Sequence, residues 1–84
     1  MVYCVYIIEA IGGMWYYGSS SDPARRLKEH NAGFNVSTRG RGPWRLIFKR
    51  EFERHADALA FEKLLKKTRN REYIQSAYKQ YFLS

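Results

Sequence analysis

The chain opens with two short segments in which apolar positions dominate. Residues 2–9, VYCVYIIE, are β-branched or aromatic almost throughout, and residues 14–18, MWYYG, have the same character, which predicts two β-strands. Apolar side chains fall on both faces of the first strand, so we expect both faces of the sheet to be covered. Gly12-Gly13 lies between the segments and supplies the backbone freedom that a hairpin requires.

The polar pattern changes to that of a helix after the second strand. In residues 21–33, SDPARRLKEHNAG, Asp22 is placed to cap a helix, Pro23 to occupy its first turn and Gly33 to end it. This punctuation predicts a helix that follows the hairpin directly.

The second half of the chain predicts a loop, a strand and two helices. Residues 33–43, GFNVSTRGRGP, are a glycine-rich basic loop, and residues 44–52, WRLIFKREF, read as a third strand. Residues 55–67, HADALAFEKLLKK, have helical periodicity, and a last helix starts at a cap formed by Asn70. Its expected apolar stripe consists of Tyr73, Ile74, Ala77, Tyr78, Tyr81 and Phe82.

The resulting element order is β-β-α-β-α-α, which predicts an α+β fold. We expect a small three-stranded antiparallel sheet flanked by three helices. With 84 residues there is room for one modest core, so residues 1–84 are expected to form a single domain.

Positive charge is concentrated in the middle of the chain. The net formal charge is +7, and residues 23–50 hold eight Lys and Arg against one acid. A local excess of this size suits a polyanion such as nucleic acid, or an anionic membrane; the alternative is a basic surface without a specific partner. We expect phosphate contacts from four of these residues: Arg39, Arg41, Arg45 and Lys49.

The cysteine and histidine content limits the classes of protein. Cys4 is the single cysteine, so no disulfide framework is expected, which fits a reducing cytoplasm. One cysteine and two histidines cannot complete a structural zinc site. The apolar run at residues 2–8 is too short to span a membrane and lacks the charged start of a signal peptide.

Polar hydrogen-bonding groups gather between the second strand and the first helix. Residues 16–31, YYGSSSDPARRLKEHN, hold tyrosines, serines, arginines and a histidine. On the helix, Arg26 borders the core face and His30 lies one turn further along that side. This arrangement suits a cation held beside a cleft, but helix geometry alone favours an ordinary boundary arginine whose stem covers apolar surface. Tyr6 and Tyr16 can likewise be core residues with polar tips, or groups that act on water.

Glu62 is an anomaly on the second predicted helix. Its neighbours at helical spacing, Ala58, Leu59 and Leu65, define an apolar face. A carboxylate on such a face is costly unless it is paired, protonated or bound to a metal. Lys66, one turn away, offers the structural alternative of an ion pair at the rim of the face.

Together these residues resemble the GIY-YIG nuclease family. The family's first motif stands here as Cys4-Val5-Tyr6 and the second as Tyr16-Tyr17-Gly18, followed by ARRLKEHN with Arg26 and His30. ALAFEKLLKK resembles the later helix, whose glutamate is Glu62. The first motif's glycine is replaced by cysteine and the middle residue of the second is tyrosine, but both motif tyrosines are present.

The resemblance implies a metal-dependent endonuclease that hydrolyses phosphodiester bonds of DNA, with RNA left open. Tyr6 or Tyr16 would act on water, Arg26 would stabilise charge on phosphorus, and His30 would support a tyrosine or the phosphate. Glu62 would hold one Mg²⁺ or Mn²⁺ ion. The alternative is a nucleic-acid-binding module of nuclease ancestry with little or no catalysis, and a third reading is a basic protein that binds proteins or ribosomes. Small standalone members of the family lack an attached targeting domain, so the resemblance also allows for a protein partner that directs the nuclease to its DNA.

A shared site depends on the geometry of the hairpin. A strict two-residue turn at Gly12-Gly13 would place Tyr6 and Tyr16 on opposite faces of the sheet, because side chains alternate along a strand. A loop of three or five residues, or a bulge, would bring both to one face. We expect the two tyrosines to share a face.

Overall fold

A three-stranded antiparallel sheet forms the centre of the protein. The computed structural model describes residues 2–83. The strands are β1 (Tyr3–Ala10), β2 (Trp15–Ser20) and β3 (Trp44–Phe52), and β1 lies between the other two. Residues 33–43 form the basic loop that leads into β3, as the sequence predicts.

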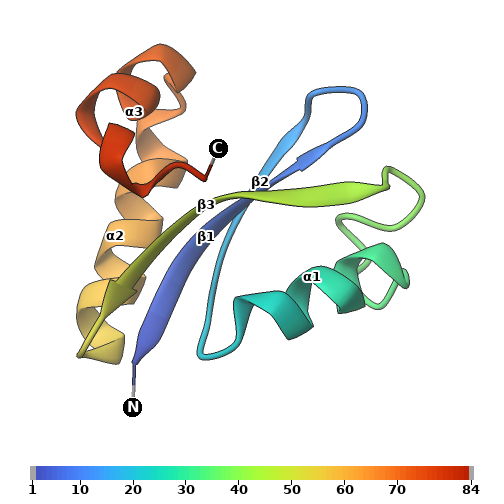
Figure 1. Cartoon of the computed structure of the whole chain (residues 1–84), viewed down its shortest axis with the longest axis horizontal. Helices are drawn as coiled ribbons and strands as arrows, with labels where there is room; N and C mark the ends of the chain where they lie inside the picture. The colour runs from blue at the N-terminus through green and yellow to red at the C-terminus, as the bar shows by residue number, and fades with distance from the viewer. Residues whose placement is uncertain (1, 84) are drawn as a thin grey trace.

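Helices cover both faces of this sheet. Helix α1 (Pro23–Asn31) packs on one face, and helices α2 (His55–Thr68) and α3 (Arg71–Ala77) lie on the other (Figure 1). A short 3₁₀ helix, η1 (Lys79–Tyr81), follows α3. The element order β-β-α-β-α-α and the α+β class are therefore as predicted. Within residues 2–83, no helix is both long enough and apolar enough to cross a bilayer.

The central strand β1 supplies side chains to both cores. Every residue from Cys4 to Ile8 is buried. Val5 and Ile7 belong to the core under α2 and α3, whereas Tyr6 and Ile8 belong to the core under α1. This alternation confirms that both faces of the first strand are covered.

The hairpin places Tyr6 and Tyr16 on the same face. Ala10 and Met14 close a three-residue loop through the bond from the Ala10 amide to the Met14 carbonyl, 2.8 Å long. Gly13 has φ +93° in this loop, the left-handed conformation that such loops use. Ile8 consequently pairs with Tyr16, so the expectation of a shared face is confirmed.

The caps of α1 are those the sequence predicts. The Asp22 side chain accepts a hydrogen bond from the Arg25 amide, and Pro23 occupies the first turn. The helix ends at Gly33, whose φ is +84°. Amides of Gly33 and Phe34 bond back to the carbonyls of the last turn, which satisfies acceptors that would otherwise lack partners.

Two expectations about the later helices are wrong in detail. Leu59 does not belong to the buried face of α2, because it is exposed; the buried residues there are Ala58, Phe61 and Leu65. The last helix is also shorter than its apolar stripe implies. Asn70 caps it, but α3 ends at Ala77 and buries only Ile74. Of the remaining stripe residues, Tyr73 and Ala77 are exposed, while Tyr78, Tyr81 and Phe82 pack on the core from the turn and 3₁₀ helix beyond α3.

A bulge in β3 changes which of its side chains face α1. The pairing between β1 and β3 shifts between Ile7 and Ile8, so Ile47 has no direct partner. Lys49 pairs with Tyr6 and faces α1, whereas Arg45 pairs with Glu9 and faces the other side. The two basic residues of this strand therefore lie on opposite faces of the sheet.

Candidate functional site

The Tyr6 side chain crosses from the central strand to the sheet edge over Gly18. The two residues are direct partners across β1 and β2. A Cβ atom at Gly18 would lie 2.5 Å from the Tyr6 hydroxyl oxygen and 2.6 Å from the ring. The glycine of the second motif is therefore required by close packing, since any larger residue would displace the tyrosine.

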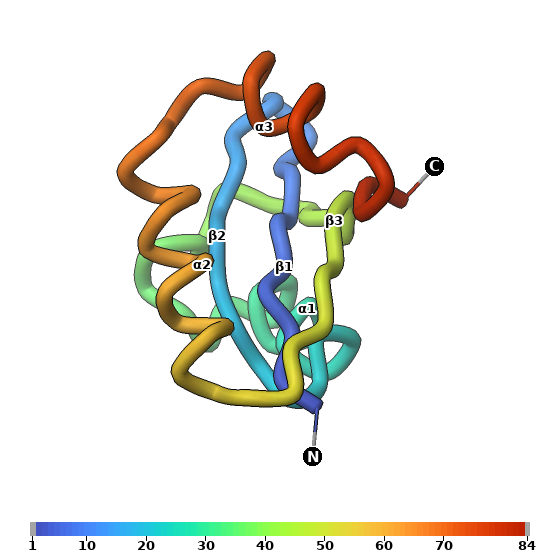
Figure 2. Tube along the Cα trace, turned by 90° about the vertical axis from the view of Figure 1, so that its left-hand side faces the viewer, coloured from blue at the N-terminus to red at the C-terminus, as the bar shows by residue number. Residues whose placement is uncertain are grey.

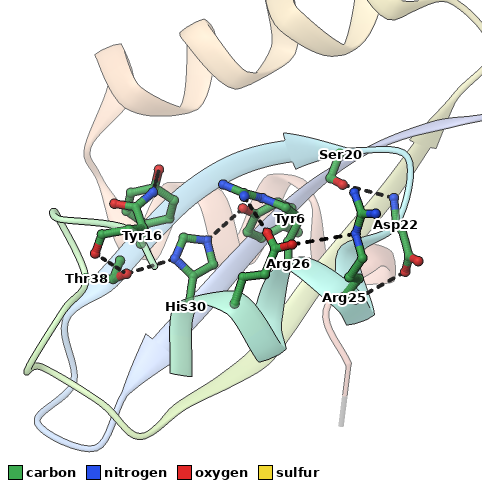
Figure 3. Close-up of polar contacts among 10 residues, drawn as sticks. Tyr6, Tyr16, Ser20, Asp22, Arg25, Arg26, His30 and Thr38 are labelled. Carbon is green, nitrogen blue, oxygen red and sulfur yellow. Dashed lines mark hydrogen bonds and ion pairs between the residues drawn. The ribbon is translucent and has the colours of Figure 1, made fainter. Parts of the chain in front are cut away.

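A buried chain of hydrogen bonds connects Tyr6 to α1 and to the basic loop. The Tyr6 hydroxyl lies 2.9 Å from Nε2 of His30, and Nδ1 of His30 lies 2.9 Å from the Thr38 hydroxyl. In Figure 3 these three residues form a line, with Arg26 on the other side of the Tyr6 hydroxyl. All three members of the chain are almost completely buried.

The hydrogen-bond network is consistent with one assignment of the His30 tautomer. In this assignment the Thr38 hydroxyl directs its one proton to the Asn35 carbonyl, 3.4 Å away. Nδ1 of His30 then donates to Thr38, and Nε2 is free to accept the proton of the Tyr6 hydroxyl. Burial, together with the nearby charge of Arg26, lowers the pKa of His30. The imidazole is therefore neutral at pH 7 and can act as an acceptor.

The two tyrosines have different environments. Burial raises the pKa of Tyr6, although the neighbouring Arg26 guanidinium opposes this shift. Tyr16 is only partly buried, its ring lies 4.8 Å from that of His30, and its hydroxyl accepts a hydrogen bond from the Asn35 amide at 3.3 Å. Tyr6 is thus the tyrosine inside the core, and Tyr16 is the one nearer to solvent.

Arg26 is a fixed cation beside the Tyr6 hydroxyl. Its guanidinium forms an ion pair with Glu29 at 2.7 Å. Contact with the Tyr6 hydroxyl, and then with Glu29, raises the pKa of Arg26, so the side chain remains charged. Arg25, the neighbouring arginine, is mainly exposed. Arg26 therefore lies at the border of the core face, as the sequence predicts.

Glu62 approaches the same edge from the opposite face of the sheet. Helix α2 runs alongside β2, with α1 on the far side of the sheet (Figure 2). One carboxylate oxygen of Glu62 accepts a 2.7 Å hydrogen bond from the Ser19 hydroxyl, and the other pairs with Lys66 at 2.8 Å. Its negative charge opposes ionisation of Tyr6. The site thus surrounds the edge strand β2 rather than lying on one face.

The donor set around Glu62 suits a hard divalent cation bound through a single carboxylate. No cluster of three or more His, Cys, Asp or Glu side chains occurs among residues 2–83. Mg²⁺ is commonly held by one or two carboxylates, with water and substrate phosphate as its other ligands. Glu62 is mostly buried yet keeps its carboxylate at the sheet edge, so it fits this mode once Lys66 moves aside.

The four basic residues expected to bind phosphate do not lie together. Arg39 and Arg41 are exposed on the loop that carries Thr38. Arg45 lies on the other face of the sheet, where it pairs with Glu9 at 2.8 Å. Lys49 faces α1 but lies on β3, which is the edge strand farther from Tyr16. The geometry therefore brings only the loop pair close to the hydrogen-bonded chain.

Three residues of the site were missed by sequence reasoning. Ser19 bonds Glu62, Asn35 bonds Tyr16, and Thr38 bonds His30. Asn35 and Thr38 lie in an irregular loop, where no periodicity indicates which side chains turn inward. The alternation of β2 predicts the face of Ser19, but only the path of α2 shows that Glu62 is its partner.

The arrangement of motif residues agrees with a comparison of the sequence with known protein families. The model of the GIY-YIG catalytic domain matches residues 2–77. This chain belongs to the GIY-YIG family. The family is a nuclease superfamily, so the protein has nuclease ancestry, and GIY-YIG nucleases generally use divalent metal ions.

Similar GIY-YIG-related proteins occur in distant organisms. A UPF0213 protein of Halalkalibacterium halodurans is 41% identical over 63 residues, covering 74% of this chain and 67% of that protein. A UPF0213 protein of Halobacterium salinarum is 40% identical over 63 residues, covering 74% and 82%. The solution NMR structure of a UPF0213 protein from Bacillus halodurans has a TM-score of 0.57 and 37% identity, covering 93% of this chain and 84% of that one. These names state no activity, and the solved structure supports the same α+β fold.

The lowered pKa of His30 predicts a specific loss of stability in acid. The unfolded chain takes up a proton near pH 6.5, whereas the folded protein does so only at lower pH. The contribution of His30 to folding is therefore complete above pH 6.5 and is lost as the pH falls through the folded pKa. We expect thermal unfolding measured from pH 7.5 to 5 to show a smaller decrease for His30→Gln than for the wild type. The surface variant His55→Gln is the control; an unchanged slope in His30→Gln would contradict the assignment.

Proposed function

We propose that this protein is a metal-dependent endonuclease that hydrolyses phosphodiester bonds of DNA. The observation that carries the proposal is the buried chain from Tyr6 through His30 to Thr38, next to Tyr16 and Arg26. Cleavage of a phosphodiester requires a group that acts on water and a cation for the charge that develops on phosphorus. Side chains with both properties meet at the edge of β2.

Tyr16 is the better placed tyrosine to contact the attacking water. A base must reach the proton that it removes, and Tyr6 is buried whereas Tyr16 is partly exposed. Tyr6 instead holds His30 and Arg26 in place through its hydroxyl. His30, as a neutral acceptor, keeps the Tyr6 hydroxyl oriented through the hydrogen bond at Nε2.

Arg26 would stabilise the charge on the phosphate, and Glu62 would hold the metal. The guanidinium is a permanent cation whose planar fork matches phosphate oxygens. A bound Mg²⁺ or Mn²⁺ supplies Lewis-acid stabilisation of the phosphate and its leaving oxygen. Glu62 would bind it from across β2 after exchanging Lys66 for the ion, while Ser19 keeps the carboxylate oriented.

The alternative is a nucleic-acid-binding module derived from a nuclease. Two observations favour it: Lys66 already neutralises Glu62, and burial raises the pKa of Tyr6. The first feature makes Glu62 less available to a metal ion, and the second makes Tyr6 harder to ionise. The basic surface suits either function, with DNA as the proposed partner and the cytoplasm as the proposed location; RNA and a targeting protein remain alternatives for experiment.

The direct test is nicking of supercoiled plasmid with Mn²⁺ and with EDTA. The wild type should nick only with metal, and Glu62→Gln should lower the rate by about 100-fold or more, because metal stabilisation supplies several kcal/mol. Glu72→Gln on α3 is the matched control. Lys66→Ala should tighten Mn²⁺ binding by freeing the carboxylate. Wild-type rates in a folded Glu62→Gln protein would end the metal assignment, and binding without nicking in the wild type would favour the module.

The two tyrosines should differ in what their removal affects. Tyr16→Phe should lower single-turnover nicking by about 100-fold or more, the range of a general base, with little change in stability. Tyr6→Phe leaves Nε2 of His30 buried without a partner, so it should also lower the free energy of unfolding by about 1–3 kcal/mol. Urea unfolding and nicking of both variants check this. Full activity in Tyr16→Phe would transfer the role to Tyr6.

The loop arginines should contribute to phosphate binding more than the arginine on the opposite face. Each phosphate contact contributes about 0.9 to the slope of log affinity against log salt. Arg39→Ala/Arg41→Ala should therefore weaken binding of duplex DNA and flatten the slope by nearly two units. Arg45→Ala, whose side chain pairs with Glu9, is the control and should leave the slope unchanged. Equal effects from both changes would contradict this placement.

A further inference from the structure

Two large apolar side chains project from the basic loop next to the site. Phe34 is 74% exposed and Val36 is 81% exposed. Single exposed apolar residues are common on protein surfaces and need no explanation. These two, however, flank Asn35, whose side-chain amide donates a hydrogen bond to the Tyr16 hydroxyl.

Helix capping does not account for Phe34. Its amide bonds the Glu29 carbonyl at 3.0 Å, and the Gly33 amide bonds the His30 carbonyl at 3.2 Å, which is the Schellman arrangement at a helix end. In that motif an apolar residue at this position usually packs on an apolar residue in the last turns of the helix. Here the residues available are Glu29 and Lys28, and the ring remains exposed.

The loop that carries these side chains is anchored at several points. The Asn31 side chain accepts a 2.6 Å hydrogen bond from the Trp44 amide and donates to its carbonyl, and the Trp44 indole donates to the Thr38 carbonyl at 3.1 Å. The Asn35 side chain accepts a hydrogen bond from the Ser37 backbone amide and donates one to the Tyr16 hydroxyl. The apolar pair therefore flanks a residue whose side chain is anchored to Tyr16.

The surroundings of the apolar pair are basic. Residues 30–50 contain no acid, and Arg39 and Arg41 are exposed on the same loop. This field attracts phosphates and disfavours contact with a second copy of the same positively charged surface. Aromatic and apolar side chains within a basic surface are typical of proteins that contact bases which have left their stack.

We propose that Phe34 and Val36 contact an unstacked base of the DNA next to the phosphate that reaches Tyr16. The inference rests on the proposed function and deepens it, because it names the substrate class as DNA with a base available outside the helix. Such a base occurs in single strands and at bulges within a duplex. Phe34 provides the flat face for stacking, and Val36 covers the edge of the base.

The test measures binding in EDTA, so that it does not depend on cleavage. Three fluorescently labelled DNAs of one sequence are compared: an intact duplex, the duplex with one bulged 2-aminopurine, and the single strand with that base. We expect the wild type to bind the two DNAs with a free base more tightly and to quench 2-aminopurine fluorescence. Phe34→Ser/Val36→Ser should lose about tenfold or more in affinity for those two, as expected when base stacking is removed, and most of the quenching.

The controls separate stacking from general effects. The intact duplex should bind the double variant within about twofold of the wild type, with the same salt slope, because the phosphate contacts persist. Tyr73→Ser, which removes another exposed ring, on α3, should behave as the wild type. Loss confined to one of the two free-base DNAs identifies the single strand or the bulge as the source of the base.

Two results would overturn the inference. The first is an equal loss of affinity on all three DNAs, and the second is a double variant that binds and quenches as the wild type does. If the wild type nicks DNA in either case, the proposed function stands and only the role of the apolar pair fails. If the wild type neither binds nor nicks DNA, the proposed function fails together with this inference.

Discussion

The hydrogen bond between the Tyr6 hydroxyl and Nε2 of His30 is the interaction on which the site depends. It joins the central strand to α1 inside the core, where an unpaired polar group would be costly. Its geometry requires a glycine at position 18 beneath the tyrosine, and it requires Thr38 on the other side of the imidazole. The strand, the helix and the basic loop are therefore fixed relative to one another by one buried polar chain.

The location of the site at a sheet edge explains how so small a core can hold it. Tyr6 and Tyr16 approach the edge from the face covered by α1, and Glu62 approaches it from the face covered by α2. Tyr16, Arg26 and Glu62 keep part of their surface exposed at this edge, whereas charged groups between two packed layers would have to be desolvated. The nuclease ancestry of the family fits our proposal that this edge is the reactive surface.

The electrostatic pattern also depends on the fold and not on composition alone. Positive charge is dense from residue 23 to residue 50, yet the bulge at Ile47 directs Arg45 to Glu9 and away from α1. The loop arginines remain on the loop that carries Asn35 and Thr38, whose side chains bond Tyr16 and His30. The basic residues are close together in the sequence, but the bulge in β3 directs Arg45 to the opposite face of the sheet. The basic surface next to the site is therefore smaller than the basic segment of the sequence.

Much of the architecture follows from the sequence by itself. The apolar character of β1, the Asp22 and Gly33 caps and the Asn70 cap are local features, since each depends on residues within a few positions of one another. The motif residues and their order likewise indicated the family. The fold class, the strands and the start of each of the three α-helices were predictable for this reason. The length of α3 and the exposure of Leu59 were not, because they depend on which neighbours the chain meets after Ala77 and around α2.

Only the tertiary structure decided how the candidate residues meet. The loop of three residues after Ala10 determined that the tyrosines share a face, since one residue fewer would have reversed β2. Burial separated Tyr6 from Tyr16, and the path of α2 brought Glu62 to Ser19, 43 residues away in the chain. Solvent access and contacts of this range are properties of the packed chain as a whole, so no local pattern in the sequence can specify them.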